Sequence, residues 1–504
     1  MKQLRTLLLA LLLLAAPAVG ASDYTLVING GRVIDPESGL DAVRHIGIYE
    51  DEIIKISEQP LMASEVIDAT GLVVSPGFID LHTHSPTPLG EHYQAFDGVT
   101  TALELEAGFF PILNYRSSSS TAPLINYGAS AGYVSMRIFE KNGMRIASGS
   151  PTHSPVGIKG WMTAALYFFT DFETAFSASF NEEATQEELQ DLRDLLLQEL
   201  DRGALGIGLA LDYFSAAIQE AEMRTIFEVA SKRAATIFVH VRRGIDGDPT
   251  GLREVIEYAR EYNASVHICH ISHNAISQLE LFLAEIREAQ ADGLDITTEV
   301  LPYNAGSAFI SAAVFVRDWK TIFNISYADV ELAATGQRFD REMWEEYREE
   351  YPESQVIHHY LKEEWTQRAI QEPGVIIVSD LLPMDTKDKK VAPHNGAFSK
   401  VLGRYVRQQE LIDLPTAIAK MSLLPARRLE SYAPAFRRKG RIQENMDADI
   451  TIFNPKTILD NASYANPFQE ATGIEYVIVN GQAIISGGQQ REGIFPGRRI
   501  LANE

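Results

Sequence analysis

The chain has 504 residues, of which 45% are hydrophobic and 22% are charged, which suits a large globular protein of two or three domains. Its formal net charge of −24 and pI near 5.0 argue against a nucleic-acid-binding protein, because phosphate backbones require a basic face. The single cysteine, Cys269, excludes an internal disulfide framework, so stability has to come from the core or from a bound metal.

The first residues have the layout of a cleaved secretory signal. Lys2 and Arg5 precede a run of leucine and alanine, and small residues ending in AVGA follow. The apolar stretch is short for a stable span once Pro17 is counted, although a retained membrane anchor is the alternative. We expect a signal peptide over residues 1–21, a mature chain without a membrane span, and a secreted or periplasmic location.

Short strands and turns dominate both ends of the mature chain. Residues 24–72 include the alternating run YTLVINGGRVID and a hairpin pattern in HIGIYEDEIIKIS, and the strand runs MDADITIF and GIEYVIVNGQAII return near the end. We therefore predict one small β-sandwich domain that is assembled from residues 22–78 and 436–504.

Apolar strand-like runs alternate with amphipathic helical patterns across the middle of the chain. The runs include GALGIGLALD, ATIFVHV, ASVHICHIS and GVIIVSD, and the helical stretches include LREVIEYAREYN. Repeated strand–helix units imply an α/β fold with a parallel sheet, and their number favours a (β/α)8 TIM-like barrel over residues 79–435. A polar region near 325–365 predicts a helical excursion inserted near a site.

In a parallel barrel, functional groups lie at the carboxyl ends of the strands, so polar residues that end apolar runs are the candidates. His82 and His84 end SPGFIDLHTH, and residues two apart on an extended backbone point to the same side. Both imidazoles can then reach one point, and neutral imidazole is a favoured zinc ligand. A chance surface pair is the alternative.

Three further strand ends carry such groups. His240 ends ATIFVHV and His270 ends ASVHICHIS, and histidines on separate strands converge on one rim, although each alone can be a hydrogen-bonded core group. Asp380 closes GVIIVSD, where a buried carboxylate is costly unless it is paired or binds metal; a helix cap is the alternative. His267, inside its strand, and His273, beyond it, are less well placed.

Two histidines after the first strand, single histidines on two later strands and an aspartate on a late strand form a pattern that resembles the amidohydrolase superfamily. The flanks SPGFIDLHTH and MDADITIF are similar to that superfamily's first strand and to its return into the small β domain. A narrower resemblance covers most of the mature chain and is to the N-acyl-D-amino-acid deacylases, including N-acyl-D-glutamate deacylases. It is carried by GVTTALELEAG, GALGIGLALDY, VHICHIS, VLPYNAGS and FSKVLGRYVR.

The bridging ligand departs from that resemblance. Many amidohydrolases bridge two metals with a carboxylated lysine on the fourth strand, but the candidate GALGIGLALDY has no lysine. D-aminoacylases resemble one another in a cysteine after GVTT, whereas Cys269 lies elsewhere and is expected in the core, on the opposite side of its strand from His270. We expect a carboxylate, Glu106 rather than Glu104 because it is nearer the strand end; a salt bridge to an arginine is the alternative.

The resemblance also implies a clamp for the substrate carboxylate, made of a tyrosine, a serine and an arginine in a late loop. Tyr303 and Ser307, in LPYNAGS, match the first two. The late loop, KDKKVAPHNGAF, lacks an arginine at the expected place, and its lysines and histidine are alternatives. Arg242 is another candidate because it lies two residues after His240 on the same strand face, with a surface arginine as the alternative.

Together these expectations describe a metal-dependent hydrolase that acts on a small molecule. We predict one or two divalent ions, zinc first and manganese, iron or cobalt as alternatives because carboxylate is a hard ligand, bound by His82, His84, Glu106, His240, His270 and Asp380. The expected reaction is hydrolysis of N-acyl-amino acids, with D-amino acids (D-Glu among them) favoured. A metal-activated water attacks, and Asp380 serves as general base and then acid.

Two alternative interpretations remain on the sequence alone. The same site can serve a dipeptidase, or a cyclic-amide hydrolase or deaminase of the same superfamily, and the scaffold can belong to a non-catalytic secreted binding protein. The sequence leaves the oligomeric state open, with a homo-oligomer among the possibilities.

Overall fold

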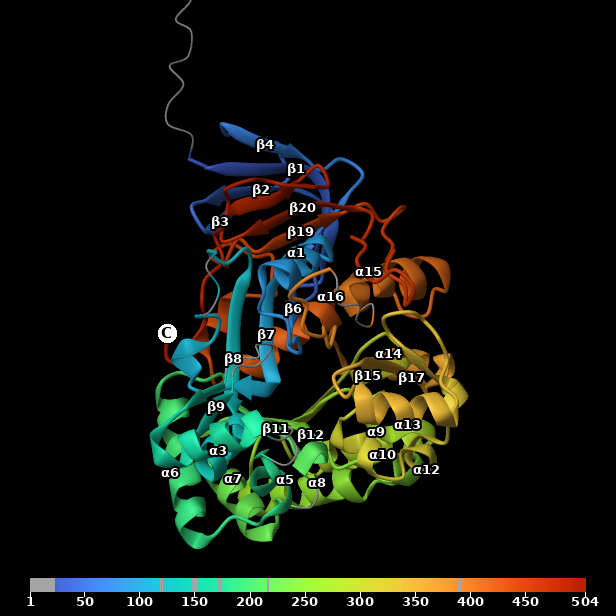
Figure 1. The fold of residues 1–504 in the computed structure, drawn as a ribbon. Coiled ribbons are helices and arrows are strands. Elements are labelled where there is room, and N and C mark those ends of the chain that lie inside the picture. The colour runs from blue at the N-terminus through green and yellow to red at the C-terminus, as the bar shows by residue number, and fades with distance from the viewer. Residues whose placement is uncertain are drawn as a thin grey trace, which may run out of the picture.

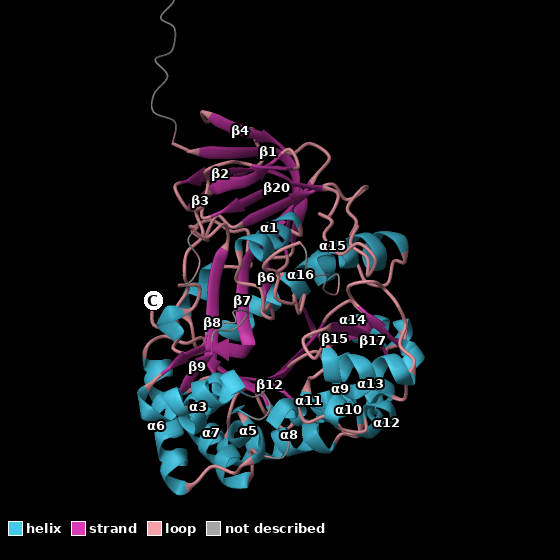
Figure 2. Ribbon diagram, in the orientation of Figure 1, coloured by secondary structure: helices cyan, strands magenta, loops and turns pink. Residues whose placement is uncertain are grey.

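The computed structural model describes residues 23–504 except 118, 120, 147–152, 170–174, 215–216, 388–391 and 393. The predicted signal peptide, residues 1–21, lies outside this part of the chain. Figure 1 shows a sheet domain at the top and a barrel below it, and Figure 2 shows helices gathered around the barrel. Among the described residues, no helix combines the length and the apolar character needed to cross a bilayer.

Eight parallel strands form the barrel, and their order in the sheet follows the chain. The last strand returns to the first, because the amide of Asp380 donates to the carbonyl of His82 at 2.9 Å and the amide of His84 donates to the carbonyl of Leu381 at 2.7 Å. The predicted (β/α)8 barrel is therefore confirmed. Its strands are β6 (Phe78–Asp80), β7 (Val99–Phe109), β8 (Asn126–Gly132), β11 (Ile207–Ala210), β12 (Ile237–His240), β13 (Val266–Ile268), β14 (Ile296–Val300) and β18 (Ile376–Ile377).

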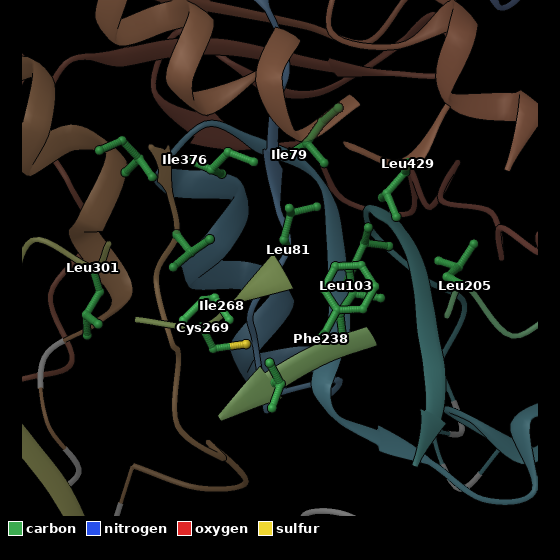
Figure 3. Close-up of a cluster of buried hydrophobic side chains, with 14 of the residues drawn as sticks. Ile79, Leu81, Leu103, Leu205, Phe238, Ile268, Cys269, Leu301, Ile376 and Leu429 are labelled. Atoms are coloured by element: carbon green, nitrogen blue, oxygen red, sulfur yellow. The ribbon is translucent and has the colours of Figure 1, made fainter. Parts of the chain in front are cut away.

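Amphipathic helices cover the outside of the barrel. They include α1 (Pro88–Phe96), α2 (Tyr133–Asn142), α6 (Gln186–Asp201), α7 (Glu220–Arg233), α8 (Thr250–Tyr262), α10 (Leu279–Ala291), α14 (Glu363–Gln371), α16 (Leu414–Met421) and α17 (Leu423–Leu429). In α8, buried residues recur at the spacing i, i+3, i+4 and i+7, which turns one apolar face toward the strands: Leu252, Val255, Ile256 and Ala259. Apolar side chains of neighbouring strands pack together in the barrel core, among them Leu81, Leu103 and Ile268 (Figure 3).

The sheet domain takes its strands from both ends of the chain, as predicted. Antiparallel pairing of β19 with β5 joins the two ends, and the amide of Ile53 donates to the carbonyl of Met446 at 2.9 Å, so the sheet wraps around an apolar core of its own. The nine strands are β1 (Leu26–Asp35), β2 (Leu40–Tyr49), β3 (Glu52–Ser57), β4 (Glu65–Asp68), β5 (Val73–Pro76), β19 (Ile450–Phe453), β20 (Ile474–Val479), β21 (Gln482–Ser486) and β22 (Gln489–Gln490).

An excursion after β14 covers the carboxyl ends of the barrel strands. It has its own apolar core, which includes Phe315, Trp319 and Trp344. The sequence predicted a helical excursion near residues 325–365, but the observed one begins earlier and contains a three-stranded antiparallel sheet. Its elements are β15 (Ala305–Phe309), α11 (Ala313–Val316), α12 (Trp319–Phe323), β16 (Val330–Leu332), α13 (Arg341–Glu350) and β17 (Gln355–His359).

Candidate metal centre

Six polar side chains meet where five barrel strands end. Two follow β6, one lies on β7, one ends β12, and one follows each of β13 and β18: His82, His84, Glu106, His240, His270 and Asp380. Their potential ligand atoms form overlapping groups in which all atoms lie within 4.8 Å of one another. The structure thus brings together all six side chains for which the sequence predicted metal binding.

Glu106 lies between two pairs of histidines. Its Oε1 is 2.9 Å from His240 Nδ1 and 2.8 Å from His270 Nε2. Its Oε2 is 3.2 Å from His82 Nε2 and 3.5 Å from His84 Nε2. Each carboxylate oxygen therefore faces its own histidine pair, as a carboxylate that bridges two cations does. The fourth barrel strand, β11, reads IGLA and contains no lysine.

A bulge in β7 brings Glu106 to this position. The pairing of β7 with β8 shifts register between Glu104 and Phe109, and Gly108 adopts a left-handed φ of 62° within the shift. Such bulges re-aim side chains at the rims of barrels. The neighbouring strand must also come close, since a Cβ on Gly208 would lie only 2.6 Å from the carbonyl oxygen of Glu106. A glycine at position 208 therefore permits the approach of β11 to the bulge.

Two outer carboxylates orient the first histidine pair. Glu299 Oε1 lies 2.5 Å from His82 Nδ1, and Glu104 Oε1 lies 2.9 Å from His84 Nδ1. An ionised carboxylate only accepts, so each Nδ1 carries a proton, and each Nε2 points into the cluster, where it would present its lone pair to a bound cation. The two Nε2 atoms lie 3.2 Å apart, an arrangement that a shared cation satisfies. The donor set therefore fits a divalent metal, and Glu104 supports His84 instead of bridging.

Asp380 lies beside this histidine pair, with Oδ1 3.5 Å from His82 Nε2 and 3.4 Å from His84 Nε2. Burial raises the pKa of Asp380, but the neighbouring His82 and His84 outweigh burial and hold that pKa below its usual range. Two of the six cluster residues have left-handed backbone, Asp380 with φ 50° and His270 with φ 32°. Each such conformation costs on the order of 1–3 kcal/mol, and strained residues of this kind recur at active sites.

A cavity of about 130 Å³ opens onto the cluster. Barrel residues line one side of it, and residues of the excursion line the other, including Ser307 and His358. The lining contains several buried nitrogen atoms that have no hydrogen-bond partner in the described structure: His270 Nδ1, His273 Nδ1 and Nε2, His358 Nδ1, His394 Nε2 and Arg243 Nε. Buried polar atoms are normally satisfied, so these atoms indicate a site that receives a polar ligand.

The residues predicted to bind substrate meet different outcomes. Ser307 lines the cavity. Tyr303 does not, because its ring stacks behind that of His394, with ring centroids 4.7 Å apart. Arg242 does not line the cavity either: its Nε donates to Glu254 at 2.9 Å, and the next residue, Arg243, lines the cavity instead. The alternation of faces on which Arg242 was chosen ends with β12 at position 240.

Several side chains near the cluster were not identified, or were not placed correctly, from the sequence. Glu299 is a buried carboxylate one residue before the end of β14, a signal like the one that identified Asp380, and it also accepts from His267 Nε2 at 2.9 Å. His273 lines the cavity although it lies beyond its strand. Cys269 is buried among apolar side chains as expected (Figure 3), yet its thiol contacts the ring of His82.

Two relatives from Alcaligenes xylosoxydans xylosoxydans align with nearly the whole chain, although no protein-family model matches it. An N-acyl-D-glutamate deacylase is 27% identical over 477 residues, covering 91% of this chain and 93% of the relative. A D-aminoacylase is 28% identical over 482 residues, covering 92% and 94%. A dihydroorotase from Streptococcus pneumoniae is 26% identical over 483 residues, covering 91% and 99%.

Solved structures share the fold. The N-acyl-D-glutamate deacylase of Bordetella bronchiseptica, solved with zinc and a phosphonate inhibitor that mimics the tetrahedral intermediate, superposes with a TM-score of 0.75 at 23% identity, covering 95% of this chain and 100% of that one. A D-aminoacylase structure gives 0.71 at 23% identity with the same coverage. These likenesses and the order of the candidate ligands along the barrel strands support a D-aminoacylase-like assignment within the amidohydrolase superfamily.

Proposed function

We propose that the chain hydrolyses the amide bond of N-acyl-D-amino acids. The observation that carries this proposal is the position of Glu106, whose two oxygens face separate histidine pairs while Asp380 lies beside one of them. A carboxylate bridge with a nearby proton acceptor suits attack of water on an amide. The relatives support the substrate class, because the two Alcaligenes proteins described above are named for removing acyl groups from D-amino acids.

The cluster would hold one or two divalent ions. Four imidazoles and two carboxylates suit zinc, which the Bordetella deacylase structure contains, while the carboxylate bridge also suits manganese, iron or cobalt. When bound, such an ion supplies Lewis acidity: it lowers the pKa of water from 15.7 toward about 7 and polarises the amide carbonyl.

Residues of the chain would transfer the protons and enclose the cavity in which the amide reacts. Asp380 is ionised and lies next to the ligand atoms of His82 and His84, so it can accept the proton of the attacking water. It then returns that proton to the leaving nitrogen, which frees the amino acid. The excursion encloses the cavity with Ser307 and His358 and so reduces the bulk water around the reacting amide.

Cyclic-amide hydrolysis is the second candidate. The dihydroorotase that aligns over 483 residues favours it. The absence of a lysine from the fourth strand does not discriminate between the two reactions, because a carboxylate bridge serves either substrate. Hydantoin carries no carboxylate, and dihydroorotate carries one on a ring carbon that is not attached to the scissile nitrogen, so the two candidates differ in where a substrate carboxylate lies relative to that nitrogen.

A panel of substrates tests the proposal. Zinc- or manganese-loaded protein is incubated with N-acetyl and N-formyl amino acids of both stereoisomers, with apolar and acidic side chains, and with hydantoin and dihydroorotate. We expect amino acid release from D-substrates at least about 100-fold faster than from L-substrates, a ratio that corresponds to about 2.7 kcal/mol of discrimination. Turnover of the cyclic amides alone would transfer the assignment to the second candidate.

A further inference from the structure

Arg243 lies in the cavity wall directly after β12. Its side chain is 8% exposed, and its Nη2 is 3.0 Å from His240 Nε2, so the guanidinium lies at the edge of the metal cluster. Its Nε is buried and has no hydrogen-bond partner in the described structure. An arginine carries five N–H donors in a rigid fork that matches a carboxylate. At least part of this fork is therefore available to a ligand.

The neighbours of Arg243 hold it without neutralising it fully. Asp212 accepts from Arg317 Nη1 at 2.6 Å and from the backbone amide of Arg243 at 2.8 Å, whereas its distance to Arg243 Nη1 is 3.8 Å, beyond a hydrogen bond. The guanidinium also lies over the ring of Phe323 at 5.3 Å, which fixes its plane. The side chain is thus positioned in advance, and its strongest ionic neighbour is engaged by another arginine.

Arg243 is the one permanently cationic side chain among the described residues that line the cavity. His358, which also lines the cavity, is neutral because burial lowers its pKa to about 3. Besides the metal ions that the cluster would hold, Arg243 is therefore the fixed positive charge that an anionic ligand group meets in the cavity.

We propose that Arg243 binds the α-carboxylate of the substrate and selects N-acyl amino acids over uncharged amides. The inference rests on the proposed function. It is supported by the short separation between Arg243 and the ligand His240, since an α-carboxylate is only two bonds from the scissile nitrogen. Arg243 would take the role for which the sequence suggested Arg242 and Tyr303, both of which the structure places outside the cavity.

The test compares N-acetyl-D-leucine with its uncharged analogue N-acetyl-D-leucinamide. We expect wild-type protein to prefer the acid in kcat/KM by about 10- to 100-fold, as for loss of a hydrogen bond to a charged group. Arg243→Met should remove this preference by lowering kcat/KM for the acid more than for the amide, and Arg243→Lys should restore part of it. Arg242→Met is the matched control, because that side chain points toward Glu254, and it should keep the preference.

Binding provides a readout that does not depend on turnover. In metal-loaded Asp380→Asn protein, calorimetry should show tighter binding of the acid than of the amide, and adding Arg243→Met should equalise the two Kd values. Release of neither D-leucine from the acid nor D-leucinamide from the amide by wild-type protein would contradict the proposed function, and the calorimetric comparison would then decide the role of Arg243 alone. Equal Kd values for the two ligands before the Arg243 change, absence of binding, or an unchanged preference in Arg243→Met would overturn the assignment.

Discussion

Replacing Asp380 with asparagine is expected to lower kcat by about 10²- to 10⁴-fold while most of the metal stays bound. The carboxylate accepts and returns the proton in the proposed reaction, and an amide of the same shape does neither. The histidines and Glu106 remain to hold the ions. Steady-state kinetics and metal analysis of the purified variant provide the measurement.

Asp413→Asn is the control for this change. Asp413 caps the N-terminus of α16, where asparagine is an equally good cap, so activity should match that of wild type. Asp380→Asn protein that retains a tenth or more of wild-type kcat would contradict the role of Asp380 as proton acceptor.

Replacing Glu106 with glutamine is expected to remove at least one ion and nearly all activity. Glutamine has one acceptor oxygen, and its amide group would present N–H donors to the histidine pair that now faces the other oxygen. We expect bound metal to fall by one equivalent or more and kcat/KM to fall by more than about 100-fold, since even outer contacts to metal ligands cost 10–100-fold. Metal analysis after gel filtration measures the first effect.

Glu104→Gln is the matched comparison, because Glu104 contacts only the outer nitrogen of His84. Its expected loss of metal affinity is about 10–100-fold, smaller than that of Glu106→Gln. A larger loss in Glu104→Gln than in Glu106→Gln would reverse the roles of the two carboxylates.

The six-residue cluster was predictable because strand ends converge. His82, His84, His240 and Asp380 each follow an apolar run, and the parallel barrel brings such ends to one rim whatever the loops do. Glu299 carries the same signal, a carboxylate in a buried strand, and was within reach of the same reasoning. The positions of the candidate ligands thus depend on the barrel topology, and the alternation of strand-like and helical patterns in the sequence predicts that topology.

The substrate side of the cavity was not predictable in the same way. Arg242 was chosen by strand alternation, but the backbone leaves extended geometry after His240 and turns Arg243 inward. His358 comes from β17 and lies more than a hundred residues after Arg243, with which it lines the cavity. No sequence pattern around His358 identifies it as a cavity residue. Such positions depend on the packing of the excursion over the barrel, which one sequence does not specify residue by residue.

The most direct test of the central claim is to strip the metal from the wild-type protein and add zinc back in steps. Bound zinc per chain and release of D-leucine from N-acetyl-D-leucine are measured at each step. We predict no turnover in the stripped protein and a return of activity as the first one or two zinc equivalents bind at the cluster around Glu106. Full turnover in the metal-free protein, or a cluster that binds zinc without hydrolysing this amide or any other in the panel, would contradict the account.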